Sequence, residues 1–189
     1  MLSFRDVLAC DLPQLLALNN QAGPGIVAIT VERLALLFDQ AAYFRVAEID
    51  GQIAGFLIAL RTNADYDSPN FAWFKAHIDD FVYIDRIVIG APFRGHGLGR
   101  VFYADVQGFA EVRSPILACE VFLEPADAVS VLFHGTWGFR EVTQLSLGKD
   151  RRVSLLTKPL CSWDWVRDTY WLGPQKALPP VPWLAERKI

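Results

Sequence analysis

A glycine-rich segment in the middle of the chain has the composition of an anion-binding loop. Its members are Arg94, Gly95, His96, Gly97, Leu98, Gly99 and Arg100. A strand pattern precedes the segment, and a helical pattern follows it directly. The first N–H groups of a helix have no internal partner, the helix dipole favours negative charge there, and glycine lets a phosphate approach the backbone. An ordinary connection between a strand and a helix would have a similar composition, so both interpretations stay open.

Three further side chains could move protons: Asp85, Glu120 and His134. Asp85 and Glu120 lie in predicted strands, and burial among apolar neighbours could raise the pKa of Asp85 towards the range of a base. An ion pair of Asp85 with Arg86 or Arg94 is the alternative. His134 lies in a predicted helix, and its unperturbed pKa of about 6.5 lets it donate or accept a proton near neutral pH. A packing role for His134 is equally open.

The other reactive side chains are weaker candidates for a catalytic or metal-binding role. Tyr83 and Glu124 are secondary candidates for a base. Cys119 alternates with Glu120 along a strand, so it faces the opposite side and is expected to be a small core residue. The three histidines and three cysteines are scattered along the sequence, and we expect no metal site.

The elements that must position these residues follow an α/β pattern. Strands are predicted at 2–8, 43–49, 52–60, 83–89, 116–122, 140–147 and 152–157, and helices at 12–18, 30–41, 98–113 and 125–136. Asp50-Gly51 is a strong hairpin signal, and helix 98–113 joins two strands that should be parallel neighbours. Asp11 and Thr30 are expected as helix caps. We therefore expect a single mixed central sheet with helices on both faces.

Residues 61–80 show no clear period. They mix turn-forming residues with Phe71, Trp73 and Phe74. We expect a loop that either packs on the surface or covers a substrate.

The glycine-rich segment carries the pattern Arg-x-x-Gly-x-Gly, on which the sequence resembles the GNAT superfamily of N-acetyltransferases. It lacks the Gly-Lys-Ser/Thr ending of a nucleotide P-loop, and it lacks GxGxxG. The segment ACDLPQLLALNN also looks like the opening of a GNAT domain. The resemblance implies that residues 94–100 bind the pyrophosphate of acetyl-CoA. It also implies that the backbone of Ile87, Val88 and Ile89 meets the pantetheine arm and the acetyl carbonyl.

A second segment, EVFLEPADAVSVLFHGTWGF at 120–139, is similar to one GNAT subgroup with a pattern of approximately EVNxDPPNxxSxxFHxxxGF. By this resemblance, His134 falls on the position of a tyrosine that often protonates the departing CoA thiolate. Asp127 falls on an asparagine, so the resemblance places it among the CoA-binding residues. Phe122 and Asp127 replace two asparagines of the subgroup pattern. The whole resemblance covers residues 3–158.

The resemblance implies transfer of an acetyl group from acetyl-CoA, as co-substrate, to a primary amine in a ternary complex. Backbone N–H groups of strand 83–89 would polarise the thioester carbonyl. A base is needed because an ammonium has no lone pair, and Asp85 and Glu120 flank the expected cleft. A small-molecule amine is the expected acceptor. The alternatives are an acyl-CoA-binding domain without turnover, and acetylation of a protein N-terminus or lysine.

Composition and charge narrow the class of protein. The 189 residues, 52% of them hydrophobic, suffice for one domain with a substantial core. A net charge of −3 without a basic block argues against nucleic acid as the main partner. No run approaches the roughly 18 apolar residues of a membrane helix. An odd number of cysteines and charged residues near the N-terminus lead us to expect a cytoplasmic protein without a signal peptide.

The C-terminal part differs from the rest of the chain. We expect residues 1–160 to form the GNAT-like domain and residues 161–189 to form an extension rich in tryptophan and proline. Its tryptophans would be costly to leave exposed, and its prolines exclude one long helix. We expect a short helix at 162–172 and then an extended arm, docked on its own domain or on a second subunit. A homodimer is the expected assembly.

Overall fold

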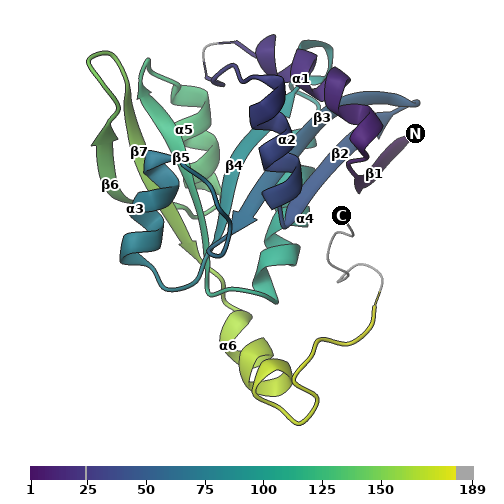
Figure 1. Cartoon of the computed structure of the whole chain (residues 1–189), viewed down its shortest axis with the longest axis vertical. Helices are drawn as coiled ribbons and strands as arrows, with labels where there is room; N and C mark the ends of the chain where they lie inside the picture. The colour runs from purple at the N-terminus through teal and green to yellow at the C-terminus, as the bar shows by residue number, and fades with distance from the viewer. Residues whose placement is uncertain (24, 182–189) are drawn as a thin grey trace.

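A computed structural model describes residues 1–23 and 25–181 of the chain. Within these residues, seven strands form one sheet in the order β1-β2-β3-β4-β5-β7-β6 (Figure 1). The strands are β1 (Leu2–Asp6), β2 (Tyr43–Ile49), β3 (Gln52–Arg61), β4 (Val82–Ile89), β5 (Ile116–Glu124), β6 (Arg140–Ser146) and β7 (Arg152–Pro159). Neighbouring strands are antiparallel except β4 and β5, which are parallel as predicted.

Helices cover both faces of the sheet, as expected. They are α1 (Leu12–Asn20), α2 (Val31–Gln40), α3 (Pro69–His77), α4 (Leu98–Glu111), α5 (Ala128–Thr136) and α6 (Trp163–Val166), which continues as a π-helical turn (Arg167–Trp171). Leu15 of α1, Leu37 of α2 and Phe71 of α3 join the hydrophobic cluster on one face. Phe102 and Val106 of α4 join the cluster on the other face. Among the described residues, no helix is long and apolar enough to cross a membrane.

Local sequence signals account for the ends of several elements. Thr30 caps α2, because its hydroxyl accepts a hydrogen bond from the N–H of Arg33 at 3.2 Å. Asp50 and Gly51 have φ values of 50° and 79°. Two successive positive values give the tight hairpin that was predicted between β2 and β3.

Two local predictions are wrong. Residues 61–80 contain the helix α3 in place of the expected loop. Ser68 caps this helix and Pro69 begins it, a combination that marks a helix start although the aromatic residues after it show no helical period. Asp11 precedes α1, but its side chain does not cap that helix. Its carboxylate instead accepts hydrogen bonds from Arg5 Nη1 at 2.6 Å and from the N–H of Leu8 at 2.8 Å.

The strands β4 and β5 are paired over only two residues each. Val82 pairs with Leu117 and Tyr83 with Ala118. Beyond this point β4 continues to Ile89 along β3 only, and β5 continues along β7 (Figure 1). The edge of β4 after Tyr83 is therefore left open towards β5.

The C-terminal segment begins with the short helix predicted for it. The indole N–H of Trp171 donates to the carbonyl of Val112 at 3.0 Å. The backbone N–H of Ser162 donates to the carboxylate of Glu111 at 2.9 Å. These contacts dock α6 and its π-helical turn on the end of α4. The end of the predicted arm, residues 182–189, lies outside the described residues.

Candidate active site

The glycine-rich loop presents backbone donors that have no partner among the described residues. Gly95 and Gly97 have φ values of 78° and 82°, left-handed conformations that favour glycine, and Gly97 directly precedes α4. Within the described residues, the N–H groups of residues 95–97 donate no hydrogen bond. Leu98 and Gly99 begin α4, so their N–H groups have no acceptor within the helix. These donors at the positive end of a helix dipole suit a pyrophosphate.

The side chains of this loop have different surroundings. Arg94 donates from Nε to the carbonyl of Ile89 at 3.0 Å and from Nη2 to the carbonyl of Ala22 at 2.8 Å. These bonds hold its positive charge at the end of β4. Leu98 is buried in the core, so it offers a ligand only its backbone. The side chains of His96 and Arg100 are exposed, as is that of Arg94.

A continuous cleft lies where β4 and β5 separate. Next to the loop it forms a cavity of about 540 Å³, the loop side, whose lining includes Ile87, Val88, Ile89, Arg94 and Gly99. It continues as a second cavity of about 350 Å³, the carboxylate side, whose lining includes Asp85 and Glu120. The residues that line both sides include Ile26, Ile87, Asp127, Ser130 and His134. A ligand bound at the loop can therefore meet a second ligand held near the carboxylates.

The backbone of β4 offers hydrogen-bond donors to the loop side. The N–H of Gly90 donates to the carbonyl of Ala54 on β3 at 2.9 Å. Because the N–H direction alternates along a strand, the N–H groups of Ile87 and Ile89 point away from β3 and into the cleft. Donors in this position can polarise a carbonyl.

Glu120 lies partly buried on the carboxylate side of the cleft. Burial raises the pKa of Glu120 from 4.5 to about 7, and the nearby charge of Asp85 adds to this effect. Hydrogen bonds from Tyr83 and Asn70 act in the opposite direction on this pKa. The Tyr83 hydroxyl donates to Oε2 of Glu120 at 2.6 Å and fixes the position of the carboxylate. Glu120 therefore exchanges a proton near neutral pH, as a general base must.

Asp85 lies beside Glu120 in the cleft but is held in an ion pair. Arg86 donates from Nε to Oδ2 of Asp85 at 2.6 Å, and both side chains are almost fully buried. The hydroxyl of Tyr66 donates to Oδ1. Arg86 also donates from Nη1 to Oδ1 of Asn19 at 2.9 Å, which ties the pair to α1. The pairing of Asp85 with Arg86 thus occurs, and Arg86 and Tyr66 each hydrogen-bond one oxygen of Asp85.

His134 is buried and hydrogen-bonded at both ring nitrogens. Its Nδ1 lies 2.7 Å from the carbonyl of Ser130, which can only accept, so Nδ1 carries a proton. Its Nε2 lies 2.5 Å from the hydroxyl of Tyr103, another buried residue that lines the cleft. Burial lowers the pKa of His134, so the neutral ring dominates near neutral pH. In that form the Tyr103 hydroxyl donates to Nε2.

Asp127 stands where the two sides of the cleft meet. Its Oδ1 accepts a hydrogen bond from the N–H of Ser130 at 3.0 Å, which caps α5. The carboxylate therefore takes the capping role that an asparagine could also play. Phe122 lines the carboxylate side, with its ring on the same face of β5 as Glu120.

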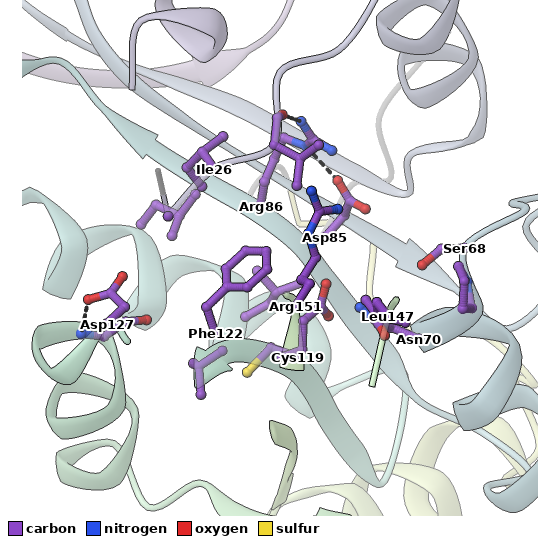
Figure 2. A pocket seen from close by; sticks show the side chains of 18 of the residues that line it. Ile26, Ser68, Asn70, Asp85, Arg86, Cys119, Phe122, Asp127, Leu147 and Arg151 are labelled. Atoms are coloured by element: carbon purple, nitrogen blue, oxygen red, sulfur yellow. Dashed lines mark hydrogen bonds and ion pairs between the residues drawn. The ribbon is translucent and has the colours of Figure 1, made fainter. Parts of the chain in front are cut away.

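Among the cleft residues that the sequence analysis did not name are Tyr66, Asn70, Tyr103 and Arg151. Figure 2 shows how residues surround the cavity on the carboxylate side. Ser68 and Asn70 lie at one wall, Ile26 and Asp127 lie at the opposite wall, and Phe122 and Arg151 lie between them. The Ser68-Pro69 helix start is a sequence signal that could have placed Asn70. The sequence gives no such signal for Tyr103 or Arg151. Tyr103 occupies one of the regularly spaced apolar positions of α4, and Arg151 follows a predicted hairpin turn.

Comparison with known proteins shows which family the chain belongs to. Residues 13–139 match the family model described as the acetyltransferase (GNAT) family. This match covers more than half of the chain and includes the glycine-rich loop, both carboxylates and His134. No curated protein matches the chain in a sequence comparison.

Solved structures share the fold at low sequence identity. The ribosomal-protein-S18-alanine N-acetyltransferase of Escherichia coli is 16% identical, with a TM-score of 0.66 over 85% of this chain and 94% of that one. The ribosomal-protein-alanine N-acetyltransferase of Brucella melitensis is 22% identical, with a TM-score of 0.63 over 84% and 99%. The protein yncA of Salmonella typhimurium, solved with its cofactor acetyl-CoA, is 17% identical, with a TM-score of 0.62 over 85% and 94%.

Proposed function

We propose that this chain, which belongs to the acetyltransferase (GNAT) family, transfers an acetyl group from acetyl-CoA directly to a primary amine of a small molecule. The observation that carries the proposal is the position of Glu120. A carboxylate with a pKa of about 7 shares one cleft with a loop of free backbone donors. The first group suits an amine and the second a pyrophosphate, so the cleft can hold both reactants at once.

Acetyl-CoA binds on the loop side. Its pyrophosphate accepts hydrogen bonds from the N–H groups of residues 95–99, with the charge of Arg94 nearby. The pantetheine arm follows the open edge of β4. The N–H groups of Ile87 and Ile89 then lie where they can polarise the thioester carbonyl.

The amine binds on the carboxylate side, and Glu120 is its base. An ammonium must lose a proton before its nitrogen can attack the acetyl carbon. Glu120 accepts that proton, because its pKa of about 7 leaves it ionised in a useful fraction at neutral pH. Asp85 is held by Arg86 and Tyr66 and contributes its charge, which keeps the pKa of Glu120 raised.

His134 serves the leaving thiolate through Tyr103. When the ring of His134 is protonated, Nε2–H donates to the Tyr103 oxygen and frees the hydroxyl hydrogen to turn towards the sulfur. A proton can then pass from Nε2 to Tyr103 and from Tyr103 to the sulfur. Because burial lowers the pKa of His134, this form is a minority at neutral pH and its contribution is modest.

A panel of amines with acetyl-CoA tests this function. We expect one free thiol for each acetylated amine found by mass spectrometry, and initial-rate lines that intersect, as direct transfer in a ternary complex requires. The panel includes small amines, lysine peptides and peptides with a free N-terminus, which separate the acceptor classes. Binding of acetyl-CoA without acetylation of any member would contradict the proposal and would favour a binding domain without turnover.

A further inference from the structure

The mouth of the carboxylate side carries an arginine that forms no ion pair with the described residues. Three arginines line this cavity: Arg33, Arg86 and Arg151. Arg33 pairs with Asp67, and Arg86 pairs with Asp85. Arg151 forms no ion pair with a carboxylate anywhere in residues 1–23 and 25–181. Its guanidinium lies 6.0 Å from the centre of the Phe122 ring, which keeps it over the cavity wall.

The path from Glu120 to Arg151 is mainly apolar. Phe122 and Leu147 line the carboxylate side, and both also line a shallower hollow that leads outwards along Ile26 and Val27. Arg151 belongs to both cavities, so it lies where the path leaves the cleft. A molecule along this path meets a carboxylate at the inner end, hydrocarbon in the middle and a guanidinium at the outer end.

We propose that the acceptor is an amino acid in the broad sense, a primary amine with an apolar spacer and a carboxylate, and that Arg151 binds that carboxylate. This inference rests on the proposed function for the amine end. A guanidinium pairs with a carboxylate through two parallel hydrogen bonds. The turn that holds Arg151 also contains Lys149 and Asp150, so its charges sum to one positive charge, which balances one carboxylate.

Arg151 is separate from the machinery for acetyl-CoA. It lines the carboxylate side and the outer hollow, whereas the loop side has its own cation in Arg94 and its own free N–H groups. Loss of the Arg151 charge should therefore change the choice of acceptor and leave the affinity for acetyl-CoA unchanged.

Matched pairs of acceptors test the inference. Straight-chain ω-amino acids of increasing length are compared with their carboxamides, in which the spacer and the amine are unchanged. We expect the wild-type protein to have a kcat/KM for at least one acid that is roughly tenfold or more above that for its carboxamide. Arg151→Gln should remove this preference by slowing the acid alone, and Arg151→Lys should keep part of it. Arg140→Gln, at an exposed arginine of β6 outside both cavities, is the matched control.

Calorimetric binding of the same pairs in the presence of CoA separates this inference from the proposed function. Preferential binding of an acid that depends on Arg151, without acetylation of any amine, would support the inference and contradict acetyl transfer. Equal kcat/KM and equal binding for acids and carboxamides would overturn the inference, even if both were acetylated. An equal decrease of kcat/KM for the acids and for the carboxamides in Arg151→Gln would overturn the inference as well.

Discussion

The two sides of the cleft are built in different ways. The hydrogen-bond donors of the loop side are backbone N–H groups from β4, the glycine-rich loop and the start of α4, all within residues 83–100, and the rest of its wall comes from Ala22, Gly25, Ile26 and residues 125–134. The carboxylate side is lined mainly by side chains, which come from α2, α3, β4, α4, β5, α5 and the turn before β7. The residues that line it are spread over more than half of the chain, as five of them show: Arg33, Asn70, Asp85, Glu120 and Arg151.

The two constructions suit two different tasks, which are binding of a phosphate and selection of an acceptor. Backbone donors bind a phosphate whatever the neighbouring side chains are, provided that glycine gives the loop its conformation. Side chains select an acceptor, and each can be exchanged without changing the loop. We therefore expect mutations on the loop side to affect binding of acetyl-CoA, and mutations on the carboxylate side to affect the chemistry and the choice of amine.

Gly97→Val should break the loop side. A β-branched residue is strained at a φ of 82°, so the loop would move and its N–H groups would leave the pyrophosphate. Loss of two hydrogen bonds to a charged group predicts affinity for CoA weaker by roughly 10²-fold or more in calorimetry. Gly51→Val, at a φ of 79° in the β2–β3 hairpin, is the control with similar strain away from the cleft. Equal CoA affinity in both variants would show that the loop does not hold the pyrophosphate.

Glu120→Gln should break the carboxylate side alone. Loss of a general base predicts a kcat/KM for the amine that is ~10²–10⁴-fold lower, whereas the affinity for acetyl-CoA should stay at the wild-type value. Glu124→Gln, at the exposed end of the same strand, is the control and should lose little. If Glu120→Gln kept the wild-type turnover rate, Glu120 would not be the base, and another group would have to accept the proton of the amine.

Substitution of His134 or Tyr103 by phenylalanine should have a smaller effect. We expect kcat to fall at neutral pH by no more than the low end of the ~10²–10⁴-fold that general acids contribute, with the KM for acetyl-CoA little changed. The double variant should lose no more than one single variant, because the two side chains act as one unit. The loss should shrink as the pH rises, since the protonated fraction of His134 falls.

The packing alternative for His134 predicts a different pattern. Weaker CoA binding and lower stability, with additive losses in the double variant, would support it. Tyr43→Phe removes another buried tyrosine hydrogen bond, to Asp105, and controls for general loss of stability.

The raised pKa of Glu120 also predicts a pH-dependent stability. The unfolded chain loses this proton near pH 4.5 and the folded chain only near pH 7, so the free energy of unfolding should fall as the pH rises between these values. At 1.36 kcal/mol for each pKa unit, the loss is at most about 3 kcal/mol, and water in the cleft would reduce it. Denaturant titrations should show this slope in the wild type but not in Glu120→Gln. The same slope in both would show that Glu120 is not the group that titrates.

Most of the fold and the loop side could be predicted from the sequence because their signals are local. Asp50-Gly51 forms its hairpin, Thr30 caps its helix, and the helix after the glycines joins two parallel strands, as predicted. The predicted GNAT family is also confirmed. The helix at Pro69–His77 was missed because its aromatic residues serve packing against Phe81 and Tyr83 and have no clean period.

The carboxylate side could be predicted only in part because its contacts are tertiary. The sequence shows that Asp85 and Glu120 are acidic residues in strands, but not which of them is paired. The pair of Asp85 with its neighbour Arg86 was one of the alternatives, but Tyr66 reaching Asp85 and Tyr83 reaching Glu120 are contacts between distant parts of the chain. The partnership of His134 with Tyr103 likewise depends on how α5 packs against α4.

The pH dependence of kcat/KM for the amine tests the central claim most directly, measured from pH 5.5 to 9 in the wild type and in Glu120→Gln. If Glu120 is the base, the wild-type value rises with pH up to about 7, where Glu120 is ionised, and then stops rising. Glu120→Gln should instead follow the fraction of free amine and keep rising without a break. Profiles of the same shape in both proteins would contradict the account, because the carboxylate side would then not contain the base that acts on the amine.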